Sequence, residues 1–220
     1  MEDFLDEVEP LVSEIRKQGL RRFEEKISSL VDQPWSELTQ EIFALDRQLQ
    51  KLNSWRVQDQ PGAIYLKISC MLLALYRTLK PLFENEDDLL NIIQETIIET
   101  NIGQDMDAFL QDHFGISPDA PDDAWDTLCK NYIVQGSQRY GCNWVFEKGI
   151  KDQRRFFVNV RKCGFADFFL DHGARDLLYT LCASDYSWGD GLKKYNIQFE
   201  RPTTLSEGSD ACRFQFIKNS

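Results

Sequence analysis

The 220-residue sequence contains none of the short motifs that mark the large enzyme families. It has no glycine-rich dinucleotide or phosphate loop, no GxSxG nucleophile elbow and no HExxH zinc motif. Only two histidines are present, so histidine-based catalysis has few places to occur. His172 lies between an aspartate and a glycine, where we expect a surface histidine at a helix C-terminus, and His113 has still less to indicate a role.

The sequence also lacks paired cysteines and an export signal. None of its six cysteines forms a CxxC pair, which excludes zinc-ribbon and thioredoxin-like motifs. The N-terminus, Met-Glu-Asp-Phe-Leu-Asp-Glu, is acidic, whereas secretion and transit signals are basic. Cysteines without a secretion signal are expected as free thiols, so we expect a cytoplasmic protein.

Positive charge is scarce as well. The formal net charge is -11, the pI is near 4.7, and no run of Lys or Arg offsets this excess. Nucleic-acid backbones and anionic lipids repel such a chain. The most apolar run, residues 64–79, contains Lys67 and Arg77 and is too short to cross a bilayer. We therefore expect no nucleic-acid or membrane partner, and we interpret this run as a core helix.

Helical periodicity dominates the chain from residue 1 to about residue 135. An apolar stripe from Trp35 to Leu52 alternates steps of three and four residues. It covers too few heptads to favour a coiled coil, so we expect it to face a core. Further helices are predicted over residues 63–79, after Pro61-Gly62, over 87–101, and around Met106 and Trp125. The turn-rich segment 115–121 is the best candidate boundary.

Strand patterns replace the helical period after Gly141. Residues 143–147 and 155–161 predict a hairpin with its turn at 148–152. Residues 165–182 return to a helix, and apolar alternation predicts strands around 195–199 and 212–216. We predict an α+β fold, with an N-terminal helical part followed by an antiparallel sheet of about four strands with an inserted helix. The helical part is 1–120 and the α+β part is 121–220, together one compact unit.

Thiols are the strong nucleophiles that remain when histidine is scarce. Cys182 and Asp185 are three residues apart and share a face if their helix persists. Cys212 alternates with Phe214, so its thiol enters the core or an aromatic pocket. By strand alternation Cys163 lies on the same face as polar residues, unless the strand ends before it. Taken singly, each is more often an inert buried thiol, and a zinc site is permitted but not indicated by the spacing. We expect inert thiols at Cys70, Cys129 and Cys142.

These residues form an ordered pattern that resembles the L-2-amino-thiazoline-4-carboxylic acid hydrolase family. Its three parts are Asn-Val-x-x-Cys, then Leu-Cys-x-x-Asp, then Arg-x-x-Thr-x-x-x-Gly-x-x-x-Cys-x-Phe. The positions that match here are Asn159, Val160, Cys163, Leu181, Cys182, Asp185, Arg201, Thr204, Gly208, Cys212 and Phe214, and Glu207 before the glycine also fits. This match covers little more than a quarter of the chain.

One departure from that pattern lies beside the last cysteine. The family usually continues Cys-Asp-Phe-Arg, whereas this chain has Cys212-Arg213-Phe214-Gln215. The ending is also similar to the 4-vinyl reductase domain, a small-molecule-binding fold whose sensor relatives hold zinc through a Glu and a Cys. The corresponding residues here are Arg201 and Thr204, so the resemblance implies no such zinc site.

The resemblance implies a hydrolase that opens a cyclic amidine-like ring at the carbon between nitrogen and sulfur. It implies catalytic roles for Cys182, Asp185, Cys212 and Cys163, with Cys182 the first choice as nucleophile. Two mechanisms remain open: a protein thiolate adds to that carbon, or a water molecule activated by Asp185 attacks it directly. The residues implied in substrate binding are Arg201, Thr204, Glu207, Gly208 and Arg213.

The predicted partner is a small molecule, without a metal or other cofactor, and the oligomeric state is left open. The competing hypothesis is a non-catalytic binding module related to 4-vinyl reductase domains, because aromatic residues are dense around the predicted sheet.

Overall fold

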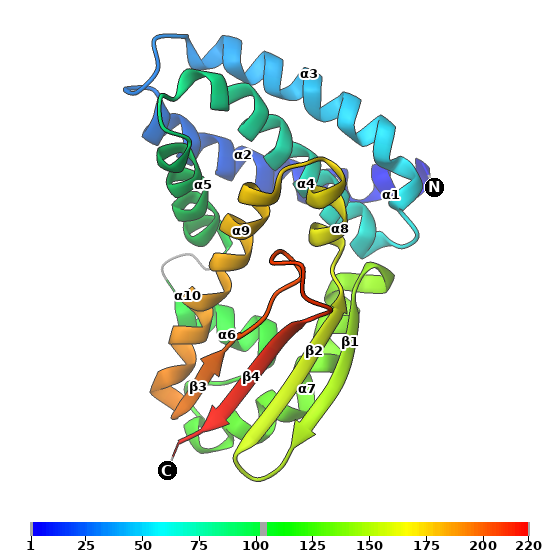
Figure 1. Ribbon diagram of the computed structural model, residues 1–220, viewed down its shortest axis with the longest axis vertical. Coiled ribbons are helices and arrows are strands. Elements are labelled where there is room, and N and C mark those ends of the chain that lie inside the picture. The colour runs from blue at the N-terminus through cyan, green and yellow to red at the C-terminus, as the bar shows by residue number, and fades with distance from the viewer. Residues whose placement is uncertain (1, 102–104, 220) are drawn as a thin grey trace.

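A computed structural model describes residues 2–101 and 105–219 as helices followed by an antiparallel sheet with a helical insertion (Figure 1). The α-helices are α1 (Glu2–Glu7), α2 (Glu9–Ile27), α3 (Trp35–Asn53), α4 (Gln60–Leu79), α5 (Glu86–Asn101), α6 (Met106–Phe114), α7 (Ala124–Tyr140), α8 (Gly164–Asp171), α9 (Arg175–Ala183) and α10 (Asp185–Gly191). The strands are β1 (Val145–Lys151), β2 (Arg155–Lys162), β3 (Ile197–Glu200) and β4 (Cys212–Lys218). This is the predicted α+β fold.

Helix α3 confirms the predicted amphipathic helix, but its inward face differs from the apolar stripe. Leu52 ends the stripe and is 63% exposed. Asp46 and Asn53 are buried instead, at 2% and 4% exposure. Both keep polar partners: Gln50 donates to the Asp46 carboxylate, and the Asn53 amide donates to a backbone carbonyl. Hydrogen bonding thus allows two polar residues to occupy core positions that hydrophobicity alone does not predict.

Helix α4 is the central helix of the N-terminal part and starts three residues earlier than predicted. The Asp59 side chain accepts a hydrogen bond from the Gly62 N–H, and Pro61 lies in the first turn, where a missing N–H costs nothing. Together with the 3-10 turn that follows it, α4 forms the segment Gln60–Leu82, which is long and apolar enough to span a bilayer. The expectation that the apolar run is too short to do so was therefore wrong. Of the segment's most apolar window, 67% is buried inside the protein, as expected for a core helix.

The sheet has the strand order β1-β2-β4-β3, with every pair antiparallel. Phe156 is paired with Phe216 and Val160 with Cys212, so these side chains share one buried face. The opposite face carries exposed residues such as Arg213. Helices α6, α7 and α10 cover the buried face, and the Cys212 end of β4 points toward the helical part (Figure 1).

The hairpin turn lies after residue 151, later than the predicted 148–152. The Asp152 carboxylate accepts hydrogen bonds from the backbone N–H groups of Arg154 and Arg155, which fixes the turn there. Gly149 lies inside β1 at an irregularity in the register. A Cβ on Gly149 would meet the Phe157 carbonyl oxygen at 3.2 Å, so this glycine allows close strand approach and does not make the turn.

The inserted helical segment consists of three short helices where one was predicted. Gly173, at φ 66°, breaks the segment between α8 and α9, close to the break expected at His172. Helices α9 and α10 follow each other directly, separated only by Ser184. The break allows α8 and α9 to pack on the N-terminal helices, while α10 packs on the sheet (Figure 1).

Two hydrophobic clusters result. The helical cluster is formed by α1 to α5 with α8 and α9, and the sheet cluster is formed by α6, α7, α10 and the four strands. Cys163, Phe165 and Leu205 pack against both clusters and mark their junction. The division at residue 120 stays a prediction.

Candidate functional site

A cavity of about 600 Å³ lies where the two clusters meet. Its wall includes residues from both, so the N-terminal helices are part of the site and not only a scaffold. Five of the nine predicted site residues line it: Cys163, Cys182, Asp185, Arg201 and Cys212.

Three different chain features direct the thiols into this cavity. β2 ends at Lys162, so Cys163 leaves the strand alternation and turns inward at the start of α8. Cys182 lies in the last turn of α9. Cys212 is the first residue of β4, and its Sγ accepts a hydrogen bond from the Leu205 N–H at 3.2 Å. The three thiols thus converge on one cavity, while their chemical roles stay predictions.

Burial keeps all three thiols protonated. It raises the pKa of Cys182 to about 12, with a further rise from the Asp185 carboxylate. Burial likewise raises the pKa of Cys163 and, against the Leu205 hydrogen bond, that of Cys212. Arg201 acts in the opposite direction on Cys182 and Cys212, but desolvation outweighs it. None of these thiols is activated as a thiolate at neutral pH.

Asp185 and Arg201 form the charged pair of the site. An Arg201 Nη1–H donates to Asp185 Oδ2 at 2.5 Å, and Nη2 donates to the Cys182 carbonyl oxygen at 2.8 Å. The indole N–H of Trp188 donates to the other Asp185 oxygen at 3.0 Å. Tyr186 and Phe214 place their rings 5.1 and 5.8 Å from the guanidinium carbon. Arg201 is thereby fixed beneath the carboxylate.

The two partners differ in accessibility. The Arg201 side chain is 4% exposed, whereas that of Asp185 is 31% exposed. Asp185 is surrounded by protein and lines the cavity, so its exposed surface faces the cavity. Burial raises the pKa of Asp185, although Arg201 and Trp188 oppose the rise. A carboxylate of this kind can exchange a proton with a molecule in the cavity.

The other four predicted residues do not line the cavity. Thr204 and Glu207 hydrogen-bond each other through side chain and backbone, as in a capping box. Gly208 follows at φ 88°, a conformation that favours glycine. Arg213 points to the outer face of β4 and pairs with Asp210. Together they shape the turn that precedes β4, so direct contact with a cavity ligand is not available to them.

Sequence reasoning missed the aromatic wall of the cavity. Tyr132, Gly136 and Tyr140 line it from one face of α7, at spacings of four residues. Gly136 makes room for the ring of Phe146, 3.1 Å from where a Cβ would lie. Burial raises the pKa of Tyr140 to about 12 and that of Tyr132 as well, with a second rise from Asp185. The spacing of two tyrosines around a glycine was the available signal.

His113 also lines the cavity, although its sequence context indicated no role. Its Nδ1–H donates to the Phe109 carbonyl oxygen, and its Nε2 accepts from Arg139 at 3.2 Å. Burial, and then Arg139, lowers the pKa of His113 to about 4 against the opposing effect of Asp112. The ring is therefore neutral near pH 7.

No group of three or more His, Cys, Asp or Glu side chains within residues 2–101 and 105–219 is arranged to hold a metal ion. The three thiols and Asp185 share a wall but not a coordination geometry.

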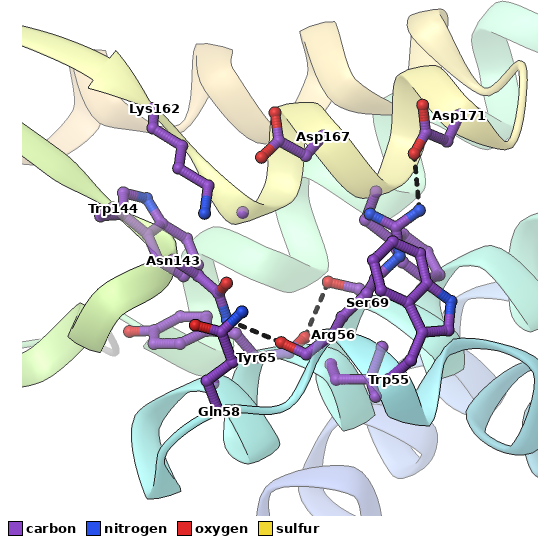
Figure 2. A pocket seen from close by; sticks show the side chains of 14 residues that line it. Trp55, Arg56, Gln58, Tyr65, Ser69, Asn143, Trp144, Lys162, Asp167 and Asp171 are labelled. Atoms are coloured by element: carbon purple, nitrogen blue, oxygen red, sulfur yellow. Dashed lines mark hydrogen bonds and ion pairs between the residues drawn. The ribbon is translucent and has the colours of Figure 1, made fainter.

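Figure 2 shows a second, smaller cleft of about 270 Å³ between α4 and α8. Lys162 and Asp167 lie at its rim, and Arg56 pairs with Asp171 at 2.6 Å. Tyr65 and Trp144 line both this cleft and the large cavity, with ring centroids 4.6 Å apart. None of the nine predicted site residues lines the cleft.

The sequence profile of the family described as L-2-amino-thiazoline-4-carboxylic acid hydrolase matches residues 66–216. This segment runs from the middle of α4 into β4 and contains all nine predicted site residues. Helices α2 and α3 precede it. No curated protein matches the sequence significantly.

Proposed function

This chain belongs to the L-2-amino-thiazoline-4-carboxylic acid hydrolase family, and we propose that it hydrolyses a C–N or C–S bond in a small heterocyclic or amidine-like substrate. One observation carries the proposal. Asp185, a carboxylate with cavity-facing surface, is held by the buried Arg201 within a largely apolar enclosure. Preorganised charge in such an enclosure acts more strongly than in water.

In the reaction that fits this pair, Asp185 takes a proton from a water molecule. The oxygen of that water adds to the ring carbon between nitrogen and sulfur. The C–S bond then breaks, the added hydroxyl passes its remaining proton to the ring nitrogen as the new carbonyl forms, and the sulfur leaves as a thiol protonated by the Asp185 carboxyl. Arg201 is a positioning residue, because one of its bonds holds the Asp185 carboxylate, the other anchors Arg201 to the Cys182 carbonyl, and its own exposure is only 4%.

A covalent route through Cys182 is the second possibility within the same reaction. It needs a thiolate, but a pKa of about 12 leaves roughly one thiol in 100,000 ionised near pH 7. The high pKa favours attack by water over attack by Cys182. Cys163 and Cys212 are subject to the same argument, since burial raises their pKa values too.

A non-catalytic binding module is the alternative function, and the apolar character of the large cavity is the observation that favours it. A cavity of this volume accommodates a drug-sized molecule. Native mass spectrometry of freshly purified protein separates the two functions. A stoichiometric organic ligand together with no turnover supports the module, and an apo mass with turnover supports the enzyme.

The proposed partner is a small molecule, with no nucleic acid or membrane partner, as the net charge of -11 supports. The proposed location is the cytoplasm, because all six cysteines are free.

The test of the enzyme is turnover of aminothiazoline carboxylate by the wild type, Asp185→Asn and Cys182→Ala. We expect Asp185→Asn to lose about 100- to 10,000-fold in kcat/KM, the usual contribution of a general base. Asp190→Asn, an exposed aspartate on the same helix paired with Lys193, is the matched control and should keep full activity. Full turnover by Asp185→Asn would exclude this mechanism.

The pH profile identifies the attacking group. Because the pKa of Asp185 is raised, kcat/KM should rise across an acid limb that lies above the ordinary aspartate range and then level off. A thiolate mechanism through Cys182 would instead keep rising toward about pH 12, and Cys182→Ala would abolish it. We expect the first profile, with Cys182→Ala active.

A further inference from the structure

The wall of the large cavity is not uniform. One part carries the thiols, Asp185 and the aromatic wall. Another part, which we name the aliphatic chamber, is formed by Ile15, Gly19 and Phe23 of α2 and by Ile64, Ile68 and Leu72 of α4. Both parts belong to one cavity, so a single molecule can contact both.

A glycine opens the chamber from the α2 side. Ile15, Gly19 and Phe23 are spaced by four residues and therefore lie on one face of α2. Phe23 is 4% exposed, which places this face toward the protein interior. A Cβ built on Gly19 has no atom of residues 2–101 or 105–219 within 4 Å. The inward face of α2 thus has a gap at Gly19 that no described side chain fills.

The facing wall is a second stripe, on α4. Ile64, Ile68 and Leu72 are again four residues apart, on a helix whose other faces are mostly buried. All three keep exposed surface although α4 is the central helix, and all three line the cavity. Their exposed surface is therefore the wall of the chamber, which is apolar on both sides.

The polar groups in the chamber wall already have partners or point elsewhere. The Arg16 guanidinium lies 3.2 Å from Glu9 and 3.3 Å from Asp46. Its Nε and Nη2 make no hydrogen bond within the described residues, but both atoms are buried away from the cavity surface. The Thr96 hydroxyl donates to a backbone carbonyl. Thr100 has an unpartnered hydroxyl, but this oxygen is buried away from the cavity surface. The chamber thus offers contact surface for hydrocarbon and no free charge for an ionic group.

The cavity is also too large for a bare ring. At about 30 Å³ per water-sized group, 600 Å³ holds about 20 such groups, whereas aminothiazoline carboxylate has about nine non-hydrogen atoms. Resting on the proposed function, we propose that the substrate is an amphiphile. Its heterocyclic or amidine-like head lies at Asp185, and an alkyl chain extends into the aliphatic chamber. Helix α2, which precedes the family match, supplies one wall of that chamber.

The test is a series of thiazolines that carry a methyl, pentyl or nonyl group on the carbon between nitrogen and sulfur. Dissociation constants are measured by calorimetry on the full-length protein, and ring opening by release of free thiol. We expect affinity to rise about fourfold for each added methylene until the chamber is full. A dissociation constant that does not change with chain length would overturn the proposal.

Two variants fill the chamber and locate the chain. Gly19→Leu projects into the open space between Ile15 and Phe23, and Ile68→Phe enlarges the facing wall. Each should weaken binding of the nonyl compound at least tenfold and leave the methyl compound unchanged. Gly19→Ala, which adds one methyl group at the same position, is the matched control and should bind the nonyl compound nearly as well as the wild type. Thermal unfolding verifies that every variant is folded.

The two proposals fail separately. Affinity that rises with chain length but without thiol release from any compound supports the chamber and contradicts the hydrolase. Thiol release from the methyl compound with no gain in affinity for longer chains supports the hydrolase and contradicts the chamber. Equal nonyl affinity in Gly19→Leu, Ile68→Phe and wild type would also place the chain elsewhere.

Discussion

The helical cluster and the sheet cluster meet at one cavity but are built from different residues. Among the described buried residues, ten of the 20 in the sheet cluster are aromatic, against four of the 26 in the helical cluster. Stacked rings such as Trp188 and Phe214, 6.4 Å apart, hold defined positions in the cavity wall, and Trp188 bonds Asp185. Aliphatic helices pack with fewer directional constraints, and a single glycine leaves an open chamber between them. Rigid aromatic packing positions the thiols and Asp185, while aliphatic packing leaves open space.

The largest expected change in stability comes from comparing two residues of α4, one in the core and one in the chamber wall. Leu73 is fully buried, whereas Ile68 has the same number of carbons and faces the chamber. We expect Leu73→Ala to cost about 4 kcal/mol in the free energy of unfolding and Ile68→Ala about 2 kcal/mol, because Ile68 borders space that is already open. Urea denaturation measures both. Equal costs would mean that the chamber is closed in solution.

Removal of the buried cation tests the sheet side. Arg201→Met removes the cation that pairs with Asp185 and a donor to the Cys182 carbonyl, so Asp185 keeps only the Trp188 bond, and we expect a loss of about 3 kcal/mol in unfolding free energy. Arg213→Met is the matched control, since Arg213 is exposed and pairs only with Asp210 at the surface; its cost should stay below about 0.5 kcal/mol. A similar cost for both variants would contradict the role assigned to Arg201.

The pH dependence of stability tests the burial of His113 in the cavity wall. Its pKa falls from 6.5 in the unfolded chain to about 4 in the fold, so the folded protein binds fewer protons between these values. The stability from the neutral ring is complete above about pH 6.5 and is lost as the pH falls toward about 4. We expect the wild type to lose about 2 kcal/mol more than His113→Gln between about pH 7 and pH 5. Parallel unfolding curves for the two proteins would contradict the burial of this ring.

Two glycines, one beside each cluster, should respond with opposite signs. Gly208 has φ 88°, so Gly208→Ala forces a left-handed alanine and should cost about 1 kcal/mol. Gly19 lies in a regular helix with open space at its Cβ, so Gly19→Ala should stabilise the protein by about 1 kcal/mol. Thermal unfolding reports both changes. A destabilised Gly19→Ala would show that the chamber wall does not tolerate added volume.

The sequence predicted much of the fold because its signals are local. The apolar period of residues 35–52 predicted α3, and alternation around Cys212 predicted β4 and its inward thiol. The hairpin turn was misplaced because Gly149 serves strand approach, while Asp152 closes the turn through side-chain hydrogen bonds. Asp46 was missed as a buried residue, because the Arg16 that balances its charge is distant in sequence.

The candidate site was only partly accessible from the sequence. The ordered pattern of residues 159–214 identified the thiols and Asp185, and eight of its members line the cavity. The same segment also supplied Thr204, Glu207, Gly208 and Arg213 as predicted site residues, but these shape the turn before β4 and lie outside the cavity wall. A sequence motif contains residues that line a site and residues that only support its shape. The spacing of the motif does not show which residues belong to which group.

By itself, the sequence determined the secondary structure, the acidic surface and the set of reactive side chains, since these depend on neighbours within a few residues. Only the tertiary structure decided that Arg201 is enclosed while Asp185 faces open space, that burial keeps the thiols protonated, and that Gly19 opens a chamber opposite Ile68. The physical reason is that desolvation, ion pairing and empty volume arise between segments far apart in the chain, so no local pattern records them.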